Sequence, residues 1–381
     1  ATRSEDPSEW LSGVYLVKLT AVGTGKQSYI PFVVREDARP SALLYQSSVT
    51  TYQAYNNWGG QSLYAFNSAA AMPATKVSFN RPYAASPHPR AASGAGAGDF
   101  LTSNAIRTVD TAPPAGWEYN FVRWLEREGY DVTYSTNLDT HENPRLLMRH
   151  EAWLSVGHDE YWSAKMRQHV EEALEAGVSL GFFSANTCYW QIRLEPSPTT
   201  GQSNRVMVAY KERASQEDPL AVDDDAANDV RVTGRWREAP VNQPEEELIG
   251  VMYEGNPAEA DLIVKTVGHW ALADTGLRPG DRVPGVLGYE ADRQFYAAPA
   301  GIDVLAESPY RYDGQVRRAQ TTVYEHPTGA IVFAAGTMQW SWALDDYNAP
   351  AVRASRRSAA VEQITRNVLH RLTSENVGMD N

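Results

Sequence analysis

The sequence predicts an α/β fold, in which a mostly parallel β-sheet is flanked by helices, follows a short β hairpin and carries a long inserted excursion. From about residue 40 onward, short apolar runs typical of buried strands alternate with amphipathic segments typical of helices. Such an alternation builds a parallel sheet through right-handed crossovers. A chain of 381 residues also exceeds what one compact core usually holds, so we expect additions to that sheet.

Residues 1–38 are expected to form the hairpin. The runs GVYLVKLTAV and SYIPFVVRE are rich in β-branched and aromatic residues, and they flank the glycine-containing turn GTGKQ. Two strands cannot bury a face by themselves, so the hairpin must pair with something else, and a remnant of an immunoglobulin-like sandwich is one candidate. The chain begins at Ala1 without an initiator methionine, as expected of a processed protein or a fragment.

Residues 39–381 are expected to form the α/β domain. Its strands are expected at 42–46, 75–80, 130–136, 151–157 and 178–186. In the helix predicted at 116–129, Trp117, Phe121 and Trp124 share one face, and Gly129 is a stop signal. Ser163 is the N-cap expected for a second helix, AKMRQHVEEALEAG.

The stretch from about 195 to 320 is expected to be an excursion from the sheet. Much of it is rich in proline and acidic residues, as in QEDPLAVDDDAAND. Asp223, Asp224 and Asp225 lack the alternating ligands and central glycine of a calcium loop, which favours a solvated acidic loop. The chain then returns with two strands in QTTVYEHPTGAIVFAAG and closes with an amphipathic helix at 358–372.

Charge and cysteine content exclude several classes of function. The net charge is -13 and the pI is about 5.1, which argues against partners such as nucleic acids and anionic membranes. No apolar run approaches the roughly 18 residues of a membrane span. A single cysteine, Cys188, excludes an internal disulfide and a cysteine-rich zinc site, so any metal must be held by oxygen or imidazole. We expect a soluble protein, either cytoplasmic or secreted after processing, and a homo-oligomer is compatible with the sequence.

Polar side chains follow four of the predicted strands. In a parallel sheet, ligands bind beyond the carboxyl ends of the strands, where the loops gather. The residues that the predicted strand ends deliver to this edge are Tyr55, Tyr83, His158, Glu160 and Asn186. Each also has an ordinary interpretation: a buried tyrosine, a helix-capping carboxylate, a histidine that orients Asp159, or a turn asparagine. Their convergence favours a hydrolytic or metal-assisted site.

Six ordered motifs then resemble one family. TYQAYNNWGGQSLY, VSFNRPY, VGHDEYWS, SANTCYWQIR, LGYE and AGTMQWSWALD are similar to motifs of the large subunit of N,N-dimethylformamidase and its bacterial relatives. The resemblance runs from about residue 12 to 372. It implies a catalytic domain with a glutamine-amidotransferase-like fold that works without a cysteine nucleophile. It also implies that the hairpin ends an immunoglobulin-like domain.

The resemblance further implies a mononuclear Fe(III) cofactor that hydrolyses the C–N bond of a small amide. Its ligands would be Tyr55, Tyr83 and Glu160, with Tyr52 as a rival to Tyr55. His158, Asn186 and Glu290 would line the site: His158 or Glu290 would handle protons, and Asn186 would donate to the oxyanion. Phenolate and carboxylate are hard oxygen donors that suit a ferric ion. The small second subunit of that enzyme cannot be inferred from this chain.

Two other hypotheses remain open. Cys188 could be the nucleophile of a cysteine-type amidohydrolase with His158 as its base, although no glycine-flanked elbow surrounds it. Alternatively, the many aromatic residues could form the platform of a non-catalytic carbohydrate-binding or surface module, which would hold no iron.

Overall fold

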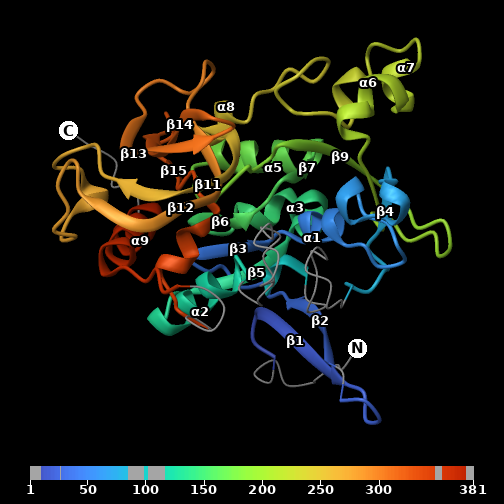
Figure 1. The fold of residues 1–381 in the computed structure, drawn as a ribbon, viewed down its shortest axis with the longest axis horizontal. Coiled ribbons are helices and arrows are strands. Elements are labelled where there is room, and N and C mark those ends of the chain that lie inside the picture. The colour runs from blue at the N-terminus through green and yellow to red at the C-terminus, as the bar shows by residue number, and fades with distance from the viewer. Residues whose placement is uncertain (1–9, 26, 85–97, 102–115, 348–353, 375–381) are drawn as a thin grey trace.

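A seven-stranded mixed sheet forms the centre of the computed structural model, which describes residues 10–25, 27–84, 98–101, 116–347 and 354–374. The strands run in the order β13-β14-β15-β8-β6-β3-β5 (Figure 1). Their bounds are Asp303–Tyr312, Gln315–Glu325, Ile331–Ala334, Ser179–Ala185, Ala152–His158, Leu43–Ser47 and Val132–Thr136, respectively. The five strands from β15 to β5 are parallel, whereas β13 and β14 pair antiparallel at one edge.

The mixed α/β architecture is therefore confirmed, but the sheet is less uniform than a simple strand–helix alternation predicts. The segment expected to leave the sheet returns to it with β13, and the hairpin β13–β14 extends the sheet antiparallel. A two-residue connection between these strands can only be antiparallel, since a parallel connection needs a crossover of about a dozen residues or more.

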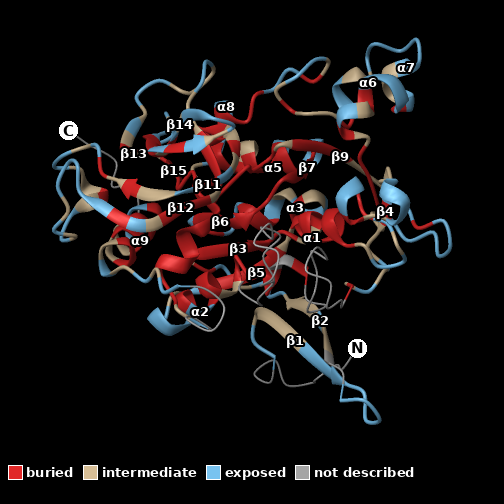
Figure 2. Ribbon diagram, in the orientation of Figure 1, coloured by how far each residue is buried: buried red, intermediate tan, exposed pale blue. Residues whose placement is uncertain are grey.

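Helices cover both faces of the sheet, as the burial of every residue along β3, β6 and β8 requires. On one face, α2 (Tyr119–Glu128) and α9 (Ala359–Leu372) pack with Tyr45, Leu154 and Phe183 in one apolar core. On the other face, α5 (Ala164–Glu175) packs with a second core. Figure 2 shows that the central strands and much of the helices around them consist of buried residues. Each buried large apolar side chain contributes about 1.5–3 kcal/mol to this packing.

The predicted caps Ser163 and Gly129 are confirmed, but α2 begins at Tyr119 rather than at 116, so Trp117 lies before the helix. The Ser163 hydroxyl accepts a hydrogen bond from the backbone N–H of Met166 (3.2 Å) at the start of α5. Gly129 ends α2 with a positive φ of 77°, a conformation that glycine adopts without strain. Ser358 caps α9 in the same way as Ser163 caps α5.

Three smaller sheets surround the central one. The hairpin β1 (Gly13–Thr20) and β2 (Gln27–Val34) is antiparallel, as predicted, and extends away from the sheet (Figure 1). A four-stranded sheet has the order β4-β10-β9-β7, with bounds Lys76–Ser78, Val206–Val208, Trp190–Glu195 and Tyr161–Ser163. The third sheet pairs β11 (Met252–Ile263) with β12 (Arg282–Arg293).

Short helices complete the part of the chain that the structure describes. Their bounds are α1 Val49–Tyr55, α3 Asn137–Glu142, α4 Pro144–Leu147, α6 Ala214–Glu217, α7 Pro219–Val222 and α8 Glu246–Ile249. The sequence analysis did not predict α1, which directly follows β3. Asp223, Asp224 and Asp225 are exposed, as expected of a solvated loop. Within the described ranges, we find no helix with the length and apolar character needed to cross a bilayer.

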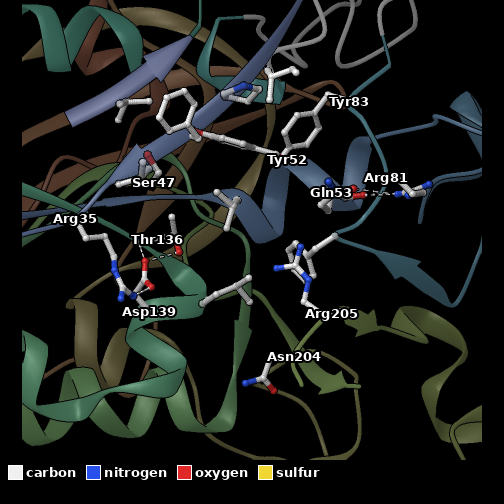
Figure 3. A pocket seen from close by; sticks show the side chains of 18 of the residues that line it. Arg35, Ser47, Tyr52, Gln53, Arg81, Tyr83, Thr136, Asp139, Asn204 and Arg205 are labelled. Carbon is white, nitrogen blue, oxygen red and sulfur yellow. Dashed lines mark hydrogen bonds and ion pairs between the residues drawn. The ribbon is translucent and has the colours of Figure 1, made fainter. Parts of the chain in front are cut away.

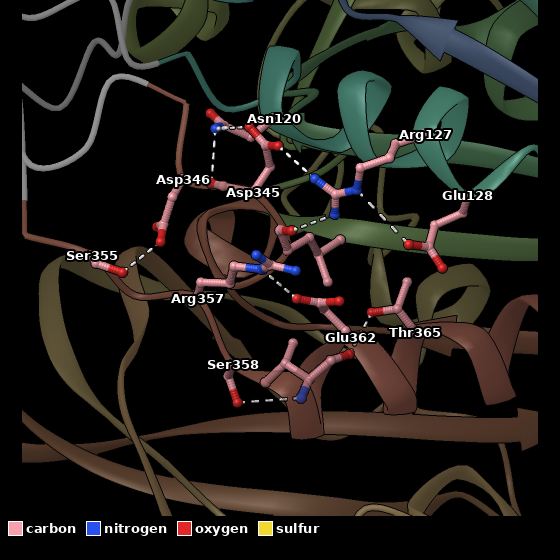
Figure 4. A network of polar contacts seen from close by, with 12 residues as sticks. Asn120, Arg127, Glu128, Asp345, Asp346, Ser355, Arg357, Ser358, Glu362 and Thr365 are labelled. Atoms are coloured by element: carbon pink, nitrogen blue, oxygen red, sulfur yellow. Dashed lines mark hydrogen bonds and ion pairs between the residues drawn. The ribbon is translucent and has the colours of Figure 1, made fainter.

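A polar network fastens α2 and α9 at one end of the domain (Figure 4). Asp345 is buried and accepts hydrogen bonds from Arg123 (3.1 Å) and Arg127 (2.9 Å), both on α2. Arg357, just before α9, donates to Glu362 on that helix (2.6 Å). These ion pairs fix the loop that connects the central sheet to the last helix.

Glu118, at the start of α2, is a buried carboxylate whose hydrogen-bond donors among the described residues are neutral. It accepts hydrogen bonds from the hydroxyls of Tyr45 (2.9 Å) and Tyr52 (2.5 Å) and from the N–H of Ser48 (3.2 Å). Burial raises the pKa of Glu118 to about 7, because these donors only partly replace lost hydration. In the folded state, the protonated form of Glu118 is therefore favoured below about pH 7.

We predict that Glu118→Gln changes how stability depends on pH. Since folding raises this pKa from 4.5 to about 7, the stabilisation it gives is present below pH 4.5 and is lost as the pH rises to 7. Urea titrations measure the unfolding free energy of the variant minus that of the wild type. This difference should be about 2 kcal/mol larger at pH 8 than at pH 5, so the variant is relatively more stable at pH 8.

Glu128→Gln provides a control of opposite sign. A hydrogen bond from Arg366 (2.8 Å) lowers the pKa of Glu128, so its removal should destabilise the protein more at pH 8 than at low pH. The prediction would be contradicted if the difference in unfolding free energy between Glu118→Gln and the wild type were the same at pH 5 and pH 8.

Candidate metal centre

Glu160 is the residue around which the site is built. It lies between β6, which ends at His158, and β7, so it sits at the carboxyl end of a central parallel strand. Its backbone N–H donates to the Thr51 hydroxyl of α1 (3.0 Å). Only 3% of Glu160 is exposed, so its carboxylate depends on protein groups for the hydrogen bonds that water would otherwise provide.

Three aromatic side chains donate to this carboxylate. The Tyr55 hydroxyl lies 2.8 Å from one oxygen of Glu160, and the Tyr64 hydroxyl lies 2.9 and 3.0 Å from the two oxygens. The indole Nε1–H of Trp190 donates from 2.9 Å. The last residue of α1, the loop after it and the first residue of β9 therefore meet at one carboxylate.

His158 joins Glu160 to a second carboxylate. Its Nε2 lies 3.2 Å from Glu160 and 3.3 Å from Glu290, which comes from β12. The Asn256 amide donates to the other oxygen of Glu290 (2.6 Å). All three residues of the His158–Glu160–Glu290 group are buried, so their charges are poorly screened and interact strongly.

The two carboxylates are driven toward different protonation states. Burial opposes ionisation of Glu160, but the hydrogen bond and charge of His158, together with Lys211, lower its pKa. Burial raises the pKa of Glu290, and the negative charge of Glu160 adds to this effect. A pair of acids whose pKa values diverge in this way is typical of sites that need one ionised and one protonated carboxyl group.

Asn186 completes the site from the end of β8. Its backbone adopts a φ of 54°, and its N–H donates to Asp292 (2.9 Å). A hydrogen bond from its side chain favours the ionised form of Glu290. The buried amide oxygen of Asn186 has no hydrogen-bond partner among the residues that the structure describes. An uncompensated buried oxygen beside two carboxylates marks a place where a ligand could bind.

The structure thus brings together five of the six predicted site residues, Tyr55, His158, Glu160, Asn186 and Glu290. It places Tyr83 elsewhere. Tyr83 packs edge-on against Tyr52, with ring centroids 6.0 Å apart, and lines a cavity of about 910 Å³ beside the hairpin (Figure 3). None of those five residues lines that cavity. Tyr52 donates to Glu118 instead, so the geometry favours Tyr55 over Tyr52 at Glu160.

The residues around Glu160 fit a hard cation. Within the described residues, we find no group of three or more His, Cys, Asp or Glu side chains that could hold a metal. The oxygen donors beside Glu160 are the phenols of Tyr55 and Tyr64. Burial and Glu160 raise the pKa values of Tyr55 and Tyr64, so both are protonated donors when no cation is bound. A hard trivalent ion could replace those two phenolic protons and take the oxygens as ligands.

Sequence reasoning missed Tyr64, Trp190 and Lys211. Tyr64 lies within the motif TYQAYNNWGGQSLY, but its distance from the predicted strand end gave no reason to select it. Trp190 begins β9, just before the predicted excursion, and Lys211 follows β10 within that excursion. The side sheet β4-β10-β9-β7 brings both residues near Glu160. No local signal identifies such residues.

Comparison with known proteins identifies the family. The family model described as "N,N-dimethylformamidase beta subunit-like, C-terminal" matches residues 1–353. The chain belongs to this family. A search of curated proteins finds no match. A solved structure described as "mmIFT52 N-terminal domain" matches with a TM-score of 0.36 and 9% identity over 68% of this chain and 90% of that chain, a likeness too low to support an argument.

Within this dimethylformamidase-like chain, Cys188 has the surroundings of a core residue. It is 1% exposed and packs in the same apolar cluster as Trp153, Trp162 and Met166. Burial raises the pKa of its thiol well above the usual value, which disfavours the nucleophilic thiolate. The geometry therefore disfavours the cysteine-type mechanism.

We predict that Cys188 is inert in the folded protein. Iodoacetamide or a disulfide reagent should label it only after unfolding, because the thiol is buried and protonated. Cys188→Ala should lose about 1–2 kcal/mol of stability at most. Rapid labelling of the native protein with loss of activity would support the thiol mechanism instead.

Proposed function

We propose that this chain is an amide hydrolase that cleaves the C–N bond of a small, formamide-like amide at a mononuclear Fe(III) centre. The observation that carries the proposal is the meeting of Tyr55, His158 and Glu290 at the buried carboxylate of Glu160, in a chain of the dimethylformamidase-like family. The parallel strands that end at this site support a glutamine-amidotransferase-like domain. Residues 1–38 are proposed to be the remnant of an immunoglobulin-like domain.

Glu160 and Tyr55 would hold the ion. The family motif assigns a further tyrosine ligand to Tyr83, an assignment that rests on the motif alone. Two phenolates and one carboxylate would balance the three charges of Fe(III) in a buried site. When bound, the ion would polarise the amide carbonyl and lower the pKa of water.

The other residues of the site are suited to moving protons and stabilising charge. The raised pKa of Glu290 lets it donate a proton to the leaving amine, and His158 lies close enough to relay that proton between Glu290 and Glu160. Asn186 borders Glu290 and would donate its amide N–H to the developing oxyanion. Burial of the whole group excludes water that would screen these interactions.

Iron content tests this proposal. Purified protein should hold about one iron per chain and absorb visible light through tyrosinate coordination, because the buried site offers one carboxylate with adjacent phenols. Glu160→Gln should abolish both signals. Glu290→Gln should keep the iron and reduce the rate of formamide hydrolysis about 10²–10⁴-fold, as expected when a general acid is removed.

Glu118→Gln is the matched control, because Glu118 is also buried and bound by two tyrosine hydroxyls. It should keep both iron and activity. A colourless wild-type protein without iron after expression in iron-rich medium would overturn the proposal and favour a non-catalytic binding module.

A further inference from the structure

We infer that Asn256 is a positioning residue of the proposed reaction: a bulge in β11 directs its amide to one oxygen of Glu290, so that the other oxygen carries the transferred proton. The inference rests on the proposed function and adds to it a residue that lies outside all six sequence motifs. Three features of the structure support it: the irregular pairing of β11 with β12, the contacts of the Glu290 carboxyl group, and the packing around the bulge.

The pairing of β11 with β12 is irregular opposite Glu290. Asn256 and Pro257 of β11 together face the single residue Glu290 of β12, between two regular pairs. These flanking pairs are Gly255–Ala291 and Ala258–Tyr289. Pro257 has no N–H to donate to the strand ladder, so the sequence itself favours an interruption here. A bulge of this kind redirects a side chain, and bulges are common beside active sites.

The two oxygens of Glu290 face different partners. The amide nitrogen of Asn256 lies 2.6 Å from Oε1, and Nε2 of His158 lies 3.3 Å from Oε2. Because an N–H donor occupies Oε1, a proton on that oxygen would meet another hydrogen, so the acidic proton of Glu290 belongs on Oε2. Asn256 thus assigns the proton to the oxygen that faces His158.

A neutral donor suits a carboxyl group that must release a proton and take it back. Burial and the negative charge of Glu160 raise the pKa of Glu290, and the hydrogen bond from Asn256 opposes this rise. A lysine or arginine at the same place would favour the ionised form more strongly, because it would add an opposite charge. Asn256 therefore orients Glu290 and still allows it to be protonated.

The hydrogen bond from Asn256 should strengthen during the proposed reaction. As the C–N bond breaks, its electron pair passes to the nitrogen, which takes the proton from Oε2 and leaves Glu290 as a carboxylate. The Asn256 N–H then donates to an ionised acceptor, which is the stronger kind of hydrogen bond. An interaction that grows toward the transition state raises kcat rather than lowering KM.

The bulge is held in place by packing on both sides. Ala258, which follows the bulge, is buried in an apolar cluster with residues of β12, β13 and β14, namely Leu287, Ala291, Tyr310 and Ala319. Before the bulge, a Cβ at Gly255 would lie only 3.0 Å from the side chain of Tyr312 in β13. The backbone on either side of Asn256 is therefore fixed, so its amide is oriented before substrate binds.

Asn256→Ala tests the inference in the iron-bound protein, with formamide as the probe. Its kcat should fall about 10–100-fold, as expected when a reacting group loses its alignment, while KM and the visible absorbance per iron stay within about twofold of wild type. Gln168→Ala is the matched control, because Gln168 also donates to a glutamate, Glu172 (2.7 Å), but on the exposed surface of α5. It should keep the wild-type kcat, and so should not reproduce the loss.

A double-mutant cycle with Glu290→Gln separates positioning from a purely structural role. If Asn256 acts through Glu290, adding Asn256→Ala to Glu290→Gln should not lower kcat further, because the two side chains act as one unit. An equal loss of kcat in both backgrounds would show a structural role and overturn the inference. A wild-type kcat in Asn256→Ala would overturn it as well.

Asn256→Asp keeps the inference testable if Asn256→Ala does not fold. It preserves the shape of the side chain but replaces the donor at Oε1 with an acceptor, so kcat should fall at least as far as in Asn256→Ala. A wild-type kcat in Asn256→Asp would overturn the inference. A wild-type protein without iron or formamide hydrolysis would instead contradict the proposed function itself.

Discussion

The buried carboxylate of Glu160 is the constraint on which the rest of the site depends. A carboxylate that is 3% exposed is stable only if the protein supplies donors or a positive charge. Tyr55, Tyr64 and Trp190 supply the donors, and His158 lies beside the same oxygens. These residues come from four separate segments, so satisfying one acid fixes the positions of α1, the loop after it, β6 and β9 relative to one another.

The same constraint gives the site its chemical asymmetry. Burial raises the pKa of Glu290 and the negative charge of Glu160 adds to this effect, whereas His158 lowers the pKa of Glu160, so the two carboxyl groups differ in their tendency to ionise. Adjacent protonated phenols complete a set of hard oxygen donors that suits a trivalent ion. In the proposed iron centre, such a ligand set would be balanced in charge only with the ion bound.

The smaller sheets contribute residues to the site around Glu160. β12 carries Glu290 to His158, and β9 carries Trp190 to Glu160, although neither strand belongs to the central sheet. The antiparallel hairpin β13–β14 extends the central sheet at the edge next to β15, on the opposite side from β3 and β5. The central sheet thus provides the frame for the site, while the side sheets close it.

The sequence by itself determined the local elements and the residues close to strand ends. The caps Ser163 and Gly129, the strands β6 and β8, and the placement of His158, Glu160 and Asn186 follow from local periodicity and capping, which act over a few residues. Only the tertiary structure decided that Tyr64 rather than Tyr83 meets Glu160, and that β13 rejoins the sheet. Both outcomes depend on loop paths and long-range packing, because contacts between segments distant in the chain leave no periodic signal in the sequence.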